Sequence, residues 1–434
     1  MIYPFRPRPF WGSRRRSDRQ RGHLMNLSRL STDAALRVRA QRVIPGGMWG
    51  HQNAARLPEA YPQYFARGEG CRLWDVDGRE YIDFMCAWGP MVLGYRDADI
   101  EAAVDAQRQR GNGLNGPTER LVELAELLVD VVPHADWAMF QKNGADATTT
   151  CVVIARAATG RRRVLVARGA YHGAVPWCNP YPLGATAEDR LHVVPYDYND
   201  AQSLAAAAES ARGDIAAVIV SAFKHDFGKD HELPTPAFAN AARALCDATG
   251  AALIVDDVRA GFRLHIGGSW ELVGVRPDLA AWSKAIANGY ALAAVTGNGR
   301  FREGASKVFV TGSFWTEAVP MAAAIATIGK LKAGDGIGRM RRMGERLREG
   351  LGRQAATHGI RIRQSGPPQM PVVLFDDDPE RKKGWLFCTE ALKRGVYLHA
   401  AHTMFLSAAH AEADIDRTLA ATDEAMREVA RQFG

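Results

Sequence analysis

Short apolar runs alternate with longer helical segments from Asp130 onward, and this alternation constrains the possible fold more than any other feature of the sequence. The pattern is typical of an α/β domain in which helices cover a mostly parallel sheet. The segments ADATTTCVVIARAATG and PAFANAARALCDATG both end in Thr-Gly, a common helix stop. The strand candidates are WAMFQK, RVLVA, LHVVPY, IAAVIVSA, ALIVDDV and AAVTGN.

The sequence changes character after Ser313, where a long apolar helical segment, EAVPMAAAIATIGKLKAGDG, leads into the C-terminal part of the chain. In that part PVVLFDD and VYLHA are strand candidates among amphipathic helices, which predicts a second, smaller α/β domain. The predicted divisions are a basic arm at 1–24, an N-terminal segment at 25–75 that joins the small domain, a large domain at 76–315, and a helix with the small domain at 316–434.

Most of the net charge of +7 lies at the start of the chain. Residues 1–24 contain seven arginines and one aspartate, so they carry +6 and the remaining residues carry only +1. Such an arm can contact phosphates or a membrane surface. However, Met25 opens a new segment with a Ser/Thr start and a helical pattern. We therefore expect the arm to be disordered or a misassigned translation start, and we expect neither a nucleic-acid nor a membrane partner.

The sequence favours a soluble, cytoplasmic protein. No apolar run approaches the roughly 18–20 residues that a membrane-spanning helix needs, and the start of the chain lacks the pattern of a cleavable leader. The cysteines contain no Cys-x-x-Cys pair, which argues against a disulfide framework and against a cysteine zinc site. We expect reduced, mostly buried thiols at Cys71, Cys86, Cys151, Cys178, Cys246 and Cys388.

One lysine, Lys284, interrupts the nearly uncharged segment AAWSKAIANGYALAAVTGN. Burial disfavours an ammonium, so such a side chain either reaches water along its stem or loses its proton, its pKa falling by as much as ~3–5 units when it is fully buried. A deprotonated lysine is a nucleophile that can form a Schiff base with an aldehyde cofactor. Lys284 is therefore a candidate catalytic residue.

The strand candidate ALIVDDV ends in two acids, Asp256 and Asp257. Open α/β sheets bind ligands at the carboxyl ends of their strands, so a carboxylate there is well placed to act, although acids at strand ends are also common caps. An aspartate facing a ring-nitrogen cation and a lysine holding an aldehyde are the two poles of a pyridoxal 5'-phosphate site. We assign these roles to Asp256 and Lys284, with Asp257 as the alternative aspartate.

A phosphate-bearing cofactor also needs an anion pocket, and FQKNGADATTT is a candidate. A strand ends there, Asn143, Gly144 and Ala145 turn the chain, and a helix begins, whose free N–H groups and dipole favour an anion. A second helix start of this kind is expected after Gly312 and Ser313. The segment GNGLNG formally matches a dinucleotide-binding loop, but it follows a polar helical segment instead of a strand, so that interpretation fails.

Tyr171 and His172 follow the strand candidate RVLVA and can place an aromatic face against a planar cofactor. In their order and rough spacing, these motifs resemble the class III, or omega, pyridoxal-phosphate aminotransferases, a family that includes glutamate-1-semialdehyde aminomutase. The resemblance covers nearly everything after Met25 and implies a fold-type I architecture. The strings HADWAMFQKNGADAT, VDDVRAGFR, FVTGSFWTEAVPMAAAI, GPPQMP and MFLSAAH are more narrowly similar to the bacterial fumonisin aminotransferases.

The resemblance implies a role at each matching position. Lys284 would attach the cofactor and then move protons, and Asp256 would keep the pyridine nitrogen protonated. Tyr171 would cover the ring face, with His172 beside it. Ser313 occupies the place of a threonine that the family takes from the partner subunit, which implies a homodimer with shared sites. The phosphate would be held by Asn143, Gly144 and Ala145.

This chain departs from the family pattern at the phosphate turn and near its N-terminus. Asn143-Gly144-Ala145 replaces the usual Ser-Gly-Thr, which removes one or two hydroxyl donors. The aminomutase binds its substrate carboxylate through an arginine near an N-terminal Pro-Gly-Gly, whereas PGGMWGHQNAAR offers an arginine only late in the segment. These differences favour a bulky, weakly polar donor. The candidate substrate contacts are Trp49, His51, Arg56, Trp88 and Arg259.

We expect an enzyme that moves an amino group from a long or bulky amine, such as a fumonisin-like amino polyol, to a small keto acid such as pyruvate, without a metal. One alternative is a 2,1-aminomutase of the glutamate-1-semialdehyde type, which would not consume pyruvate. Another is a nucleic-acid-binding protein with a degenerate cofactor domain, and the presence of both Lys284 and Asp256 argues against it.

Overall fold

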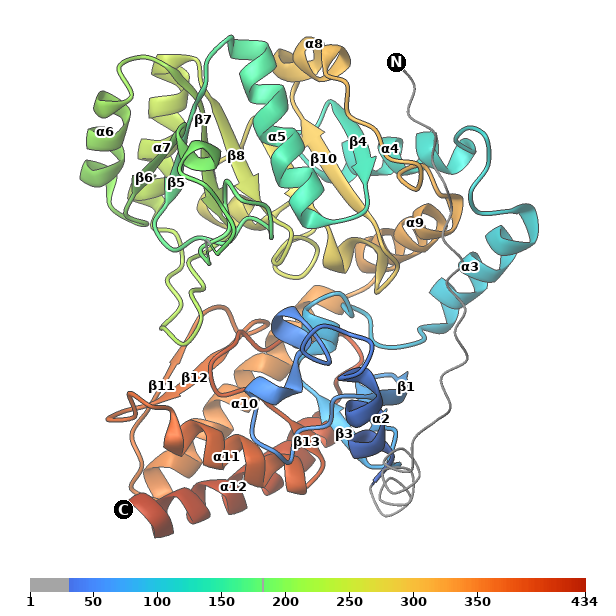
Figure 1. Cartoon of the computed structure of the whole chain (residues 1–434), viewed down its shortest axis with the longest axis vertical. Helices are drawn as coiled ribbons and strands as arrows, with labels where there is room; N and C mark the ends of the chain where they lie inside the picture. The colour runs from blue at the N-terminus through green and yellow to red at the C-terminus, as the bar shows by residue number, and fades with distance from the viewer. Residues whose placement is uncertain (1–30, 182) are drawn as a thin grey trace, which may run out of the picture. The chain divides into compact units, whose positions relative to one another are not determined.

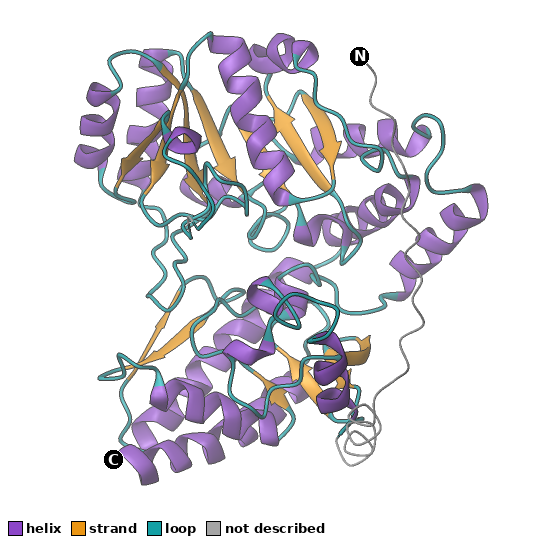
Figure 2. Ribbon diagram, viewed as in Figure 1, coloured by secondary structure: helices purple, strands orange, loops and turns teal. Residues whose placement is uncertain are grey.

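The computed structural model describes residues 31–181 and 183–434, drawn in Figures 1 and 2 by chain position and by secondary structure. The basic arm predicted at 1–24 lies outside the described residues. The chain forms two compact units. The first unit extends to Arg67 and includes Trp74–Arg79, and the second contains Gly68–Leu73 and Glu80–Gly434.

The first unit contains helix α2 (Thr32–Ala40), in the segment where the sequence predicts a helix with a Ser/Thr start. Ser31 caps this helix, because its Oγ accepts a hydrogen bond from the Ala34 amide at 3.3 Å. Two short 3₁₀ turns follow, η1 (Gly50–Gln52) and η2 (Ala54–Arg56). The predicted capping start is therefore confirmed.

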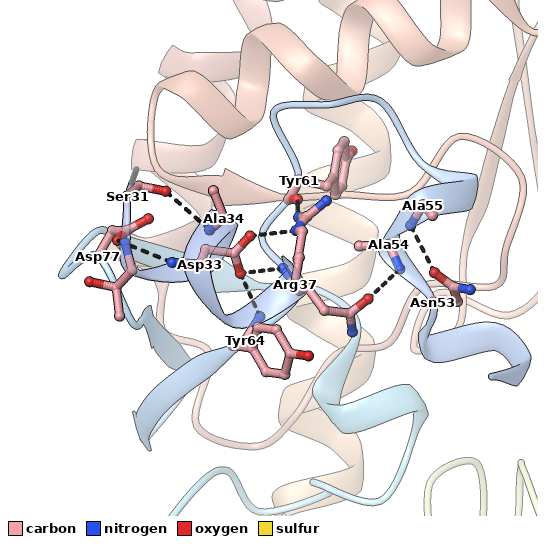
Figure 3. A network of polar contacts seen from close by, with 12 residues as sticks. Ser31, Asp33, Ala34, Arg37, Asn53, Ala54, Ala55, Tyr61, Tyr64 and Asp77 are labelled. Atoms are coloured by element: carbon pink, nitrogen blue, oxygen red, sulfur yellow. Dashed lines mark hydrogen bonds and ion pairs between the residues drawn. The ribbon is translucent and has the colours of Figure 1, made fainter. Parts of the chain in front are cut away.

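Asp33 organises the first unit through its buried carboxylate (Figure 3). Its Oδ1 accepts hydrogen bonds from the amides of Gln63 and Tyr64, at 2.8 and 2.9 Å. Its Oδ2 accepts a hydrogen bond from Nε of Arg37 at 2.6 Å, and Arg37 also donates to the carbonyl oxygen of Tyr61. One carboxylate thus joins the first turn of α2 to a loop about thirty residues later in the chain.

The second unit is built on a seven-stranded sheet with the order β4-β10-β9-β8-β7-β5-β6 (Figure 1). Neighbouring strands are parallel except that β10 runs antiparallel to both β4 and β9. The mostly parallel sheet and its six strand candidates are confirmed, and β9 is an additional strand in the segment just before Lys284. The strands are β4 (Trp137–Gln141), β5 (Arg163–Ala167), β6 (Val193–Tyr196), β7 (Ile215–Ser221), β8 (Ala252–Asp256), β9 (Leu279–Trp282) and β10 (Ala293–Gly297).

Helices cover both faces of this sheet. Val164 and Val166 of β5 enter a core with apolar residues of α5 (Gly144–Thr159) and α8 (Gly299–Lys307). The alternate residues Leu165 and Ala167 enter a second core with α6 and α7, as the period of two along a strand requires. The predicted Thr-Gly stops are confirmed for α5 and α7, which end before Gly160 and Gly250. The remaining helices on this part of the chain are α3 (Ala98–Arg110), α4 (Glu119–Val131), α6 (Ala201–Ser210), α7 (Pro236–Thr249) and α9 (Ala318–Ala333).

The C-terminal part of the second unit contains the two strands predicted there and three helices. β3 (Glu80–Asp83) pairs in parallel with β13 (Val396–Tyr397), and β11 (Ile362–Ser365) pairs antiparallel with β12 (Val372–Phe375). The chain crosses between the two units through β1 and β2. The division into a large and a small α/β domain stays a prediction. The other elements are β1 (Phe65–Glu69), β2 (Arg72–Asp75), α10 (Gly336–Thr357), α11 (Lys382–Lys393) and α12 (Glu412–Phe433).

Two further expectations concern cysteines and membranes. All six cysteines are free and buried, as predicted. Over residues 31–181 and 183–434, no helix combines the length and the apolar character that crossing a bilayer requires.

The Asp33 network predicts that Asp33→Ala loosens the 61–64 loop. The substitution leaves two buried amides and the Arg37 guanidinium without their acceptor, a loss of about 1–3 kcal/mol of local stability. Hydrogen exchange of a peptide covering residues 61–66 should accelerate in this variant and less in Asp33→Asn, which keeps one oxygen acceptor. Glu59→Ala, which removes an exposed carboxylate of the same unit, is the control. Unchanged exchange in Asp33→Ala would contradict the role of this carboxylate.

Candidate active site

Asp256 lies at the carboxyl end of β8, near the middle of the seven-stranded sheet and in register with Ser221 of β7 and Ala281 of β9. Its Oδ2 accepts a hydrogen bond from Nδ1 of His172 at 2.7 Å, and the amide of Val258 lies 3.2 Å from its Oδ1. The His172 side chain is fully buried and that of Asp256 is 10% exposed. His172 therefore fixes the orientation of a carboxylate that still reaches the surface of the sheet edge.

Asp257, the alternative aspartate, points elsewhere. Its Oδ2 accepts a hydrogen bond from the Ser269 amide at 2.7 Å, and burial raises the pKa of its carboxyl to about 6. Successive side chains at a strand end point to opposite faces, so only one of the two acids can join His172. The geometry favours Asp256 as the acid that acts.

Lys284 follows β9 and opens the short turn η6 (Lys284–Ala287) with a left-handed backbone, φ +49°. Burial lowers the pKa of its amine to about 8; the Arg259 charge also lowers this pKa, and Asp256 raises it. A Cβ at Gly89 would lie 3.2 Å from Cδ of Lys284, so the absence of a side chain at Gly89 leaves room for the lysine stem. The amine therefore loses its proton at a lower pH than an exposed lysine does.

A strained turn precedes Gly89. Cys86, Ala87 and Trp88 all have positive φ, at +47°, +52° and +65°, a conformation that is unfavourable by ~1–2 kcal/mol for each such residue. Arg263, which is completely buried, holds the turn by donating from Nη2 to the carbonyl oxygen of Gly89 at 2.6 Å and from Nη1 to the carbonyl oxygen of Leu406. Strain of this kind persists only where the surrounding structure enforces it.

The turn presents Trp88 to a group of histidines. The ring centroid of Trp88 lies 4.9 Å from that of His402 and 5.9 Å from that of His399, both edge-on. His399 also contacts Trp385 and Phe227, with ring centroids 5.0 and 5.9 Å away. We call these five residues the aromatic wall. Burial lowers the pKa of His399 to about 4, so this wall carries a neutral imidazole.

The predicted phosphate turn is present between β4 and α5. The amides of Asp146 and Ala147 donate to the carbonyl oxygen of Asn143, and the amide of Asn143 donates to Asp146 Oδ2 at 2.9 Å. This capping box uses the polar groups of Asn143. The backbone amides of Gly144 and Ala145 are therefore the first-turn donors best placed to hold an anion.

Two glycines bring the neighbouring segments close to this turn. A Cβ at Gly144 would lie 2.6 Å from Val258, and a Cβ at Gly173 would lie 2.6 Å from the Cβ of Ala145. Thr148 Oγ1 donates to the carbonyl oxygen of His172 at 2.6 Å. One packed site is therefore formed by the start of α5, the loop after β5 and Val258.

The long helix predicted after Ser313 is present. Residues 313–316 form a turn, and α9 begins at Ala318. Asn112 fixes this start, because its carbonyl oxygen and its Oδ1 accept the amides of Ala318 and Val319, both at 3.0 Å. The start of α9 is thus capped from a distant segment, and Ser313 lies exposed ahead of it.

The five predicted substrate contacts fall into two groups. Trp49, His51 and Arg56 belong to the first compact unit, in and beside η1 and η2, and their role stays a prediction. Trp88 and Arg259 belong to the second unit together with Lys284. The sequence analysis missed His399 and His402. Two histidines in HAAHT, directly after a predicted strand, were the signal that could have identified them.

The described residues fit pyridoxal phosphate. Lys284 has an amine of lowered pKa for the aldehyde, and Asp256 is a carboxylate oriented toward the sheet edge for the pyridine nitrogen. Gly144 and Ala145 can hold the phosphate through their amides, and Tyr171 is 40% exposed, as a residue that covers a ring must be. His172 is hydrogen-bonded to Asp256 through Nδ1, and its Nε2 has no hydrogen-bond partner in the described part of the chain.

Comparison with known proteins identifies the family of this chain. The family model described as aminotransferase class-III matches residues 55–413. An aminopentol aminotransferase of Sphingopyxis macrogoltabida is 52% identical over 398 residues, which cover 92% of this chain and 94% of the relative. A glutamate-1-semialdehyde 2,1-aminomutase of Chloroherpeton thalassium is 30% identical, covering 92% of this chain and 98% of the relative.

A solved structure is similar over nearly the same range. It is the FumI protein of Sphingopyxis sp. MTA144 in its PLP internal aldimine form, with a TM-score of 0.92 and 51% identity over 92% of this chain and 97% of that one. The family match and the shared fold agree. The chain therefore belongs to the class-III aminotransferases and is a pyridoxal-phosphate-dependent aminotransferase.

Proposed function

We propose that this enzyme takes an amino group from a long, hydroxyl-bearing amine and passes it to a small keto acid such as pyruvate. The observation that carries the donor class is the aromatic wall, which begins one residue before the glycine that packs on Lys284. Such a wall offers apolar ring surface for a carbon chain and, at His399, a neutral imidazole for a hydroxyl group. The 52% identical relative is named for an aminopentol, an amine with five hydroxyl groups, and this supports the same donor class.

The residues of this chain have separable parts in the reaction. Bound pyridoxal phosphate supplies an electron-withdrawing ring that stabilises negative charge on the carbon that carries the amino group. Lys284 Nζ acts first as the base that removes the proton from that carbon and then as the acid that gives a proton back. A pKa of about 8 suits both roles near neutral pH. Asp256 holds a proton on the ring nitrogen, and His172 positions Asp256.

The first test uses the purified holoenzyme with an amino polyol of the aminopentol type and pyruvate. Alanine should form in equal amount to the carbonyl product of the amine. Lys284→Ala should stay folded and bind the cofactor but form no alanine, because the base and attachment point is gone. Conversion of glutamate-1-semialdehyde without pyruvate consumption would instead support the aminomutase, which the 30% identical relative makes the second candidate. Near-normal turnover by Lys284→Ala would overturn both.

The two acids after β8 should respond differently to substitution. Asp256→Asn should lower kcat by several orders of magnitude with little change in folding, because the ring nitrogen loses the charge that keeps it protonated. Asp257→Asn should act mainly on thermal stability, since its carboxylate accepts the Ser269 amide inside the protein. The measurements are kcat and the unfolding temperature of both variants. A larger kcat loss in Asp257→Asn would reverse the assignment.

We further propose that the active enzyme is a homodimer in which Ser313 of one chain completes the phosphate site of the other. Phe309 and Phe314 near Ser313 are 93% and 65% exposed in the single chain, and a partner surface would cover them.

In the dimer, Ser313→Ala should weaken cofactor binding by about one charge-assisted hydrogen bond, ~1.5–3 kcal/mol. Removing the cofactor should weaken the dimer, because a ligand that binds only the assembled form stabilises it. Sedimentation equilibrium with and without cofactor measures this, and Ser306→Ala, an exposed serine of α8, is the control. A cofactor-independent monomer would contradict the shared site.

A further inference from the structure

Arg259 carries a positive charge that the described residues leave without a carboxylate partner. It lies three residues after Asp256, in the segment between β8 and the buried Arg263, and it is only partly exposed. Within residues 31–181 and 183–434 its recorded hydrogen bond is one from Nη1 to Oγ1 of Thr403, at 3.4 Å. A guanidinium has five N–H donors and stays charged. Most of its donors are therefore available to a ligand.

Arg263 provides the contrast within the same segment. It is completely buried and also lacks a carboxylate partner, but its Nη1 and Nη2 donate to the carbonyl oxygens of Leu406 and Gly89. The guanidinium carbon of Arg263 also lies 5.1 Å from the ring centroid of Phe405. Both terminal nitrogens of Arg263 thus hold the backbone, whereas Arg259 makes no such backbone contact among the described residues. Leaving a charge partly buried and unpaired is unfavourable unless a ligand completes it.

The groups around Arg259 are mostly neutral or positive. Burial lowers the pKa of Lys284, His225 and His231, and the Arg259 charge lowers each of these pKa values further. Burial raises the pKa of Tyr171, and the Arg259 charge opposes that rise. The pKa of His231 falls to about 4, so that ring is neutral near pH 7.

Asp256 is the acid that acts on both Arg259 and Lys284, and its Oδ2 is already engaged by Nδ1 of His172. Thr403 Oγ1, which receives the Arg259 donor, lies 3.2 Å from Nε2 of His231. The surroundings of Arg259 therefore favour an anion. Among the groups named in these interactions, Asp256 is the carboxylate, and it is already bonded to His172.

We propose that Arg259, assisted by the hydroxyl of Thr403, binds the carboxylate of the acceptor keto acid and of the amino acid formed from it. A planar guanidinium matches a carboxylate through two parallel hydrogen bonds. Binding there holds the carbonyl carbon of the keto acid on the Lys284 side of the site. The inference rests on the proposed function, because it supplies the acceptor subsite for that reaction.

This assignment separates the two substrates. The donor class proposed above has hydroxyl groups and no carboxylate, so it has no need of Arg259. The acceptor is small and cannot reach along the aromatic wall, so its carboxylate is its main handle. Removal of the guanidinium should therefore affect one half of the reaction and spare the other.

The experiment compares holoenzyme, Arg259→Gln, Arg259→Lys and the control Arg168→Gln, which removes an exposed arginine paired with Asp197 after β5. Absorbance of the bound cofactor follows each half-reaction alone. In Arg259→Gln the KM for pyruvate should rise about 10- to 100-fold, as expected for lost charge-assisted hydrogen bonds. The donor half-reaction and the reaction with acetaldehyde, which is pyruvate without its carboxylate, should change little. Arg259→Lys, which keeps the charge without the planar fork, should be intermediate.

Direct binding gives a readout that is independent of turnover. Calorimetric titration of the holoenzyme with propionate, an unreactive carboxylate, should show binding that Arg259→Gln weakens and Arg168→Gln leaves unchanged. Loss of the Arg259 charge should also raise the pKa of Lys284 above about 8, so the pH midpoint for cofactor attachment to the apoprotein should move upward.

The outcomes separate the inference from the proposed function. Unchanged propionate affinity and pyruvate KM in Arg259→Gln, or an equal loss with pyruvate and acetaldehyde, would overturn the carboxylate subsite. A wild-type enzyme that is inert to pyruvate with every amine would overturn the proposed function instead, whatever propionate does.

Discussion

The hydrogen bond between His172 and Asp256 is the interaction on which the rest of the site depends. It joins the loop after β5 to the end of β8 and so turns the edge of a sheet into a site with one defined orientation. Thr148 of α5 donates to the backbone carbonyl oxygen of the same histidine. This hydrogen bond joins His172 to the helix proposed to hold the phosphate. Asp256, the turn before α5 and Lys284 each lie within a few residues of a strand end. The sheet therefore positions all three candidate groups.

Much of this arrangement could be predicted from the sequence. The period of apolar residues located six strands of the main sheet, and the Thr-Gly stops located the ends of α5 and α7. Local pattern failed where distant contacts decide. The pattern predicts α9 after Ser313, but it could not show that Asn112, 207 residues away from Val319, caps this helix. The choice between Asp256 and Asp257 likewise needed the fold, since both acids have the same local sequence and only one meets a histidine. Strand β9 was missed because its four residues merge with the small, apolar segment around Lys284.

The two arginines of VRAGFR show how one short segment can serve both stability and specificity. Arg263 is completely buried and donates to two backbone carbonyl oxygens, whereas Arg259 is partly exposed and donates to one side-chain hydroxyl. Both residues are arginines of the same short segment, so the difference between them follows from the groups that each side chain contacts. In the proposed reaction, Arg259 and the neutral imidazoles of His225 and His231 would favour the anionic acceptor, while the aromatic wall would hold the uncharged chain of the donor. One active site would in this way serve two substrates of different charge in turn.

The left-handed turn at 86–89 has a consequence for how this enzyme can be altered. Arg263 holds the backbone of this turn by donating to the carbonyl oxygen of Gly89. The same guanidinium donates to the carbonyl oxygen of Leu406, which lies more than 300 residues after the turn. The side chain of Trp88 therefore projects from a scaffold that does not depend on the indole itself. Exchange of that ring for a smaller one should leave more space beside the aromatic wall without disturbing Lys284, whereas insertions in the turn would break the contacts of Arg263. Natural variation in donor range is thus easiest to accommodate through side chains at this position, and hardest through changes in loop length.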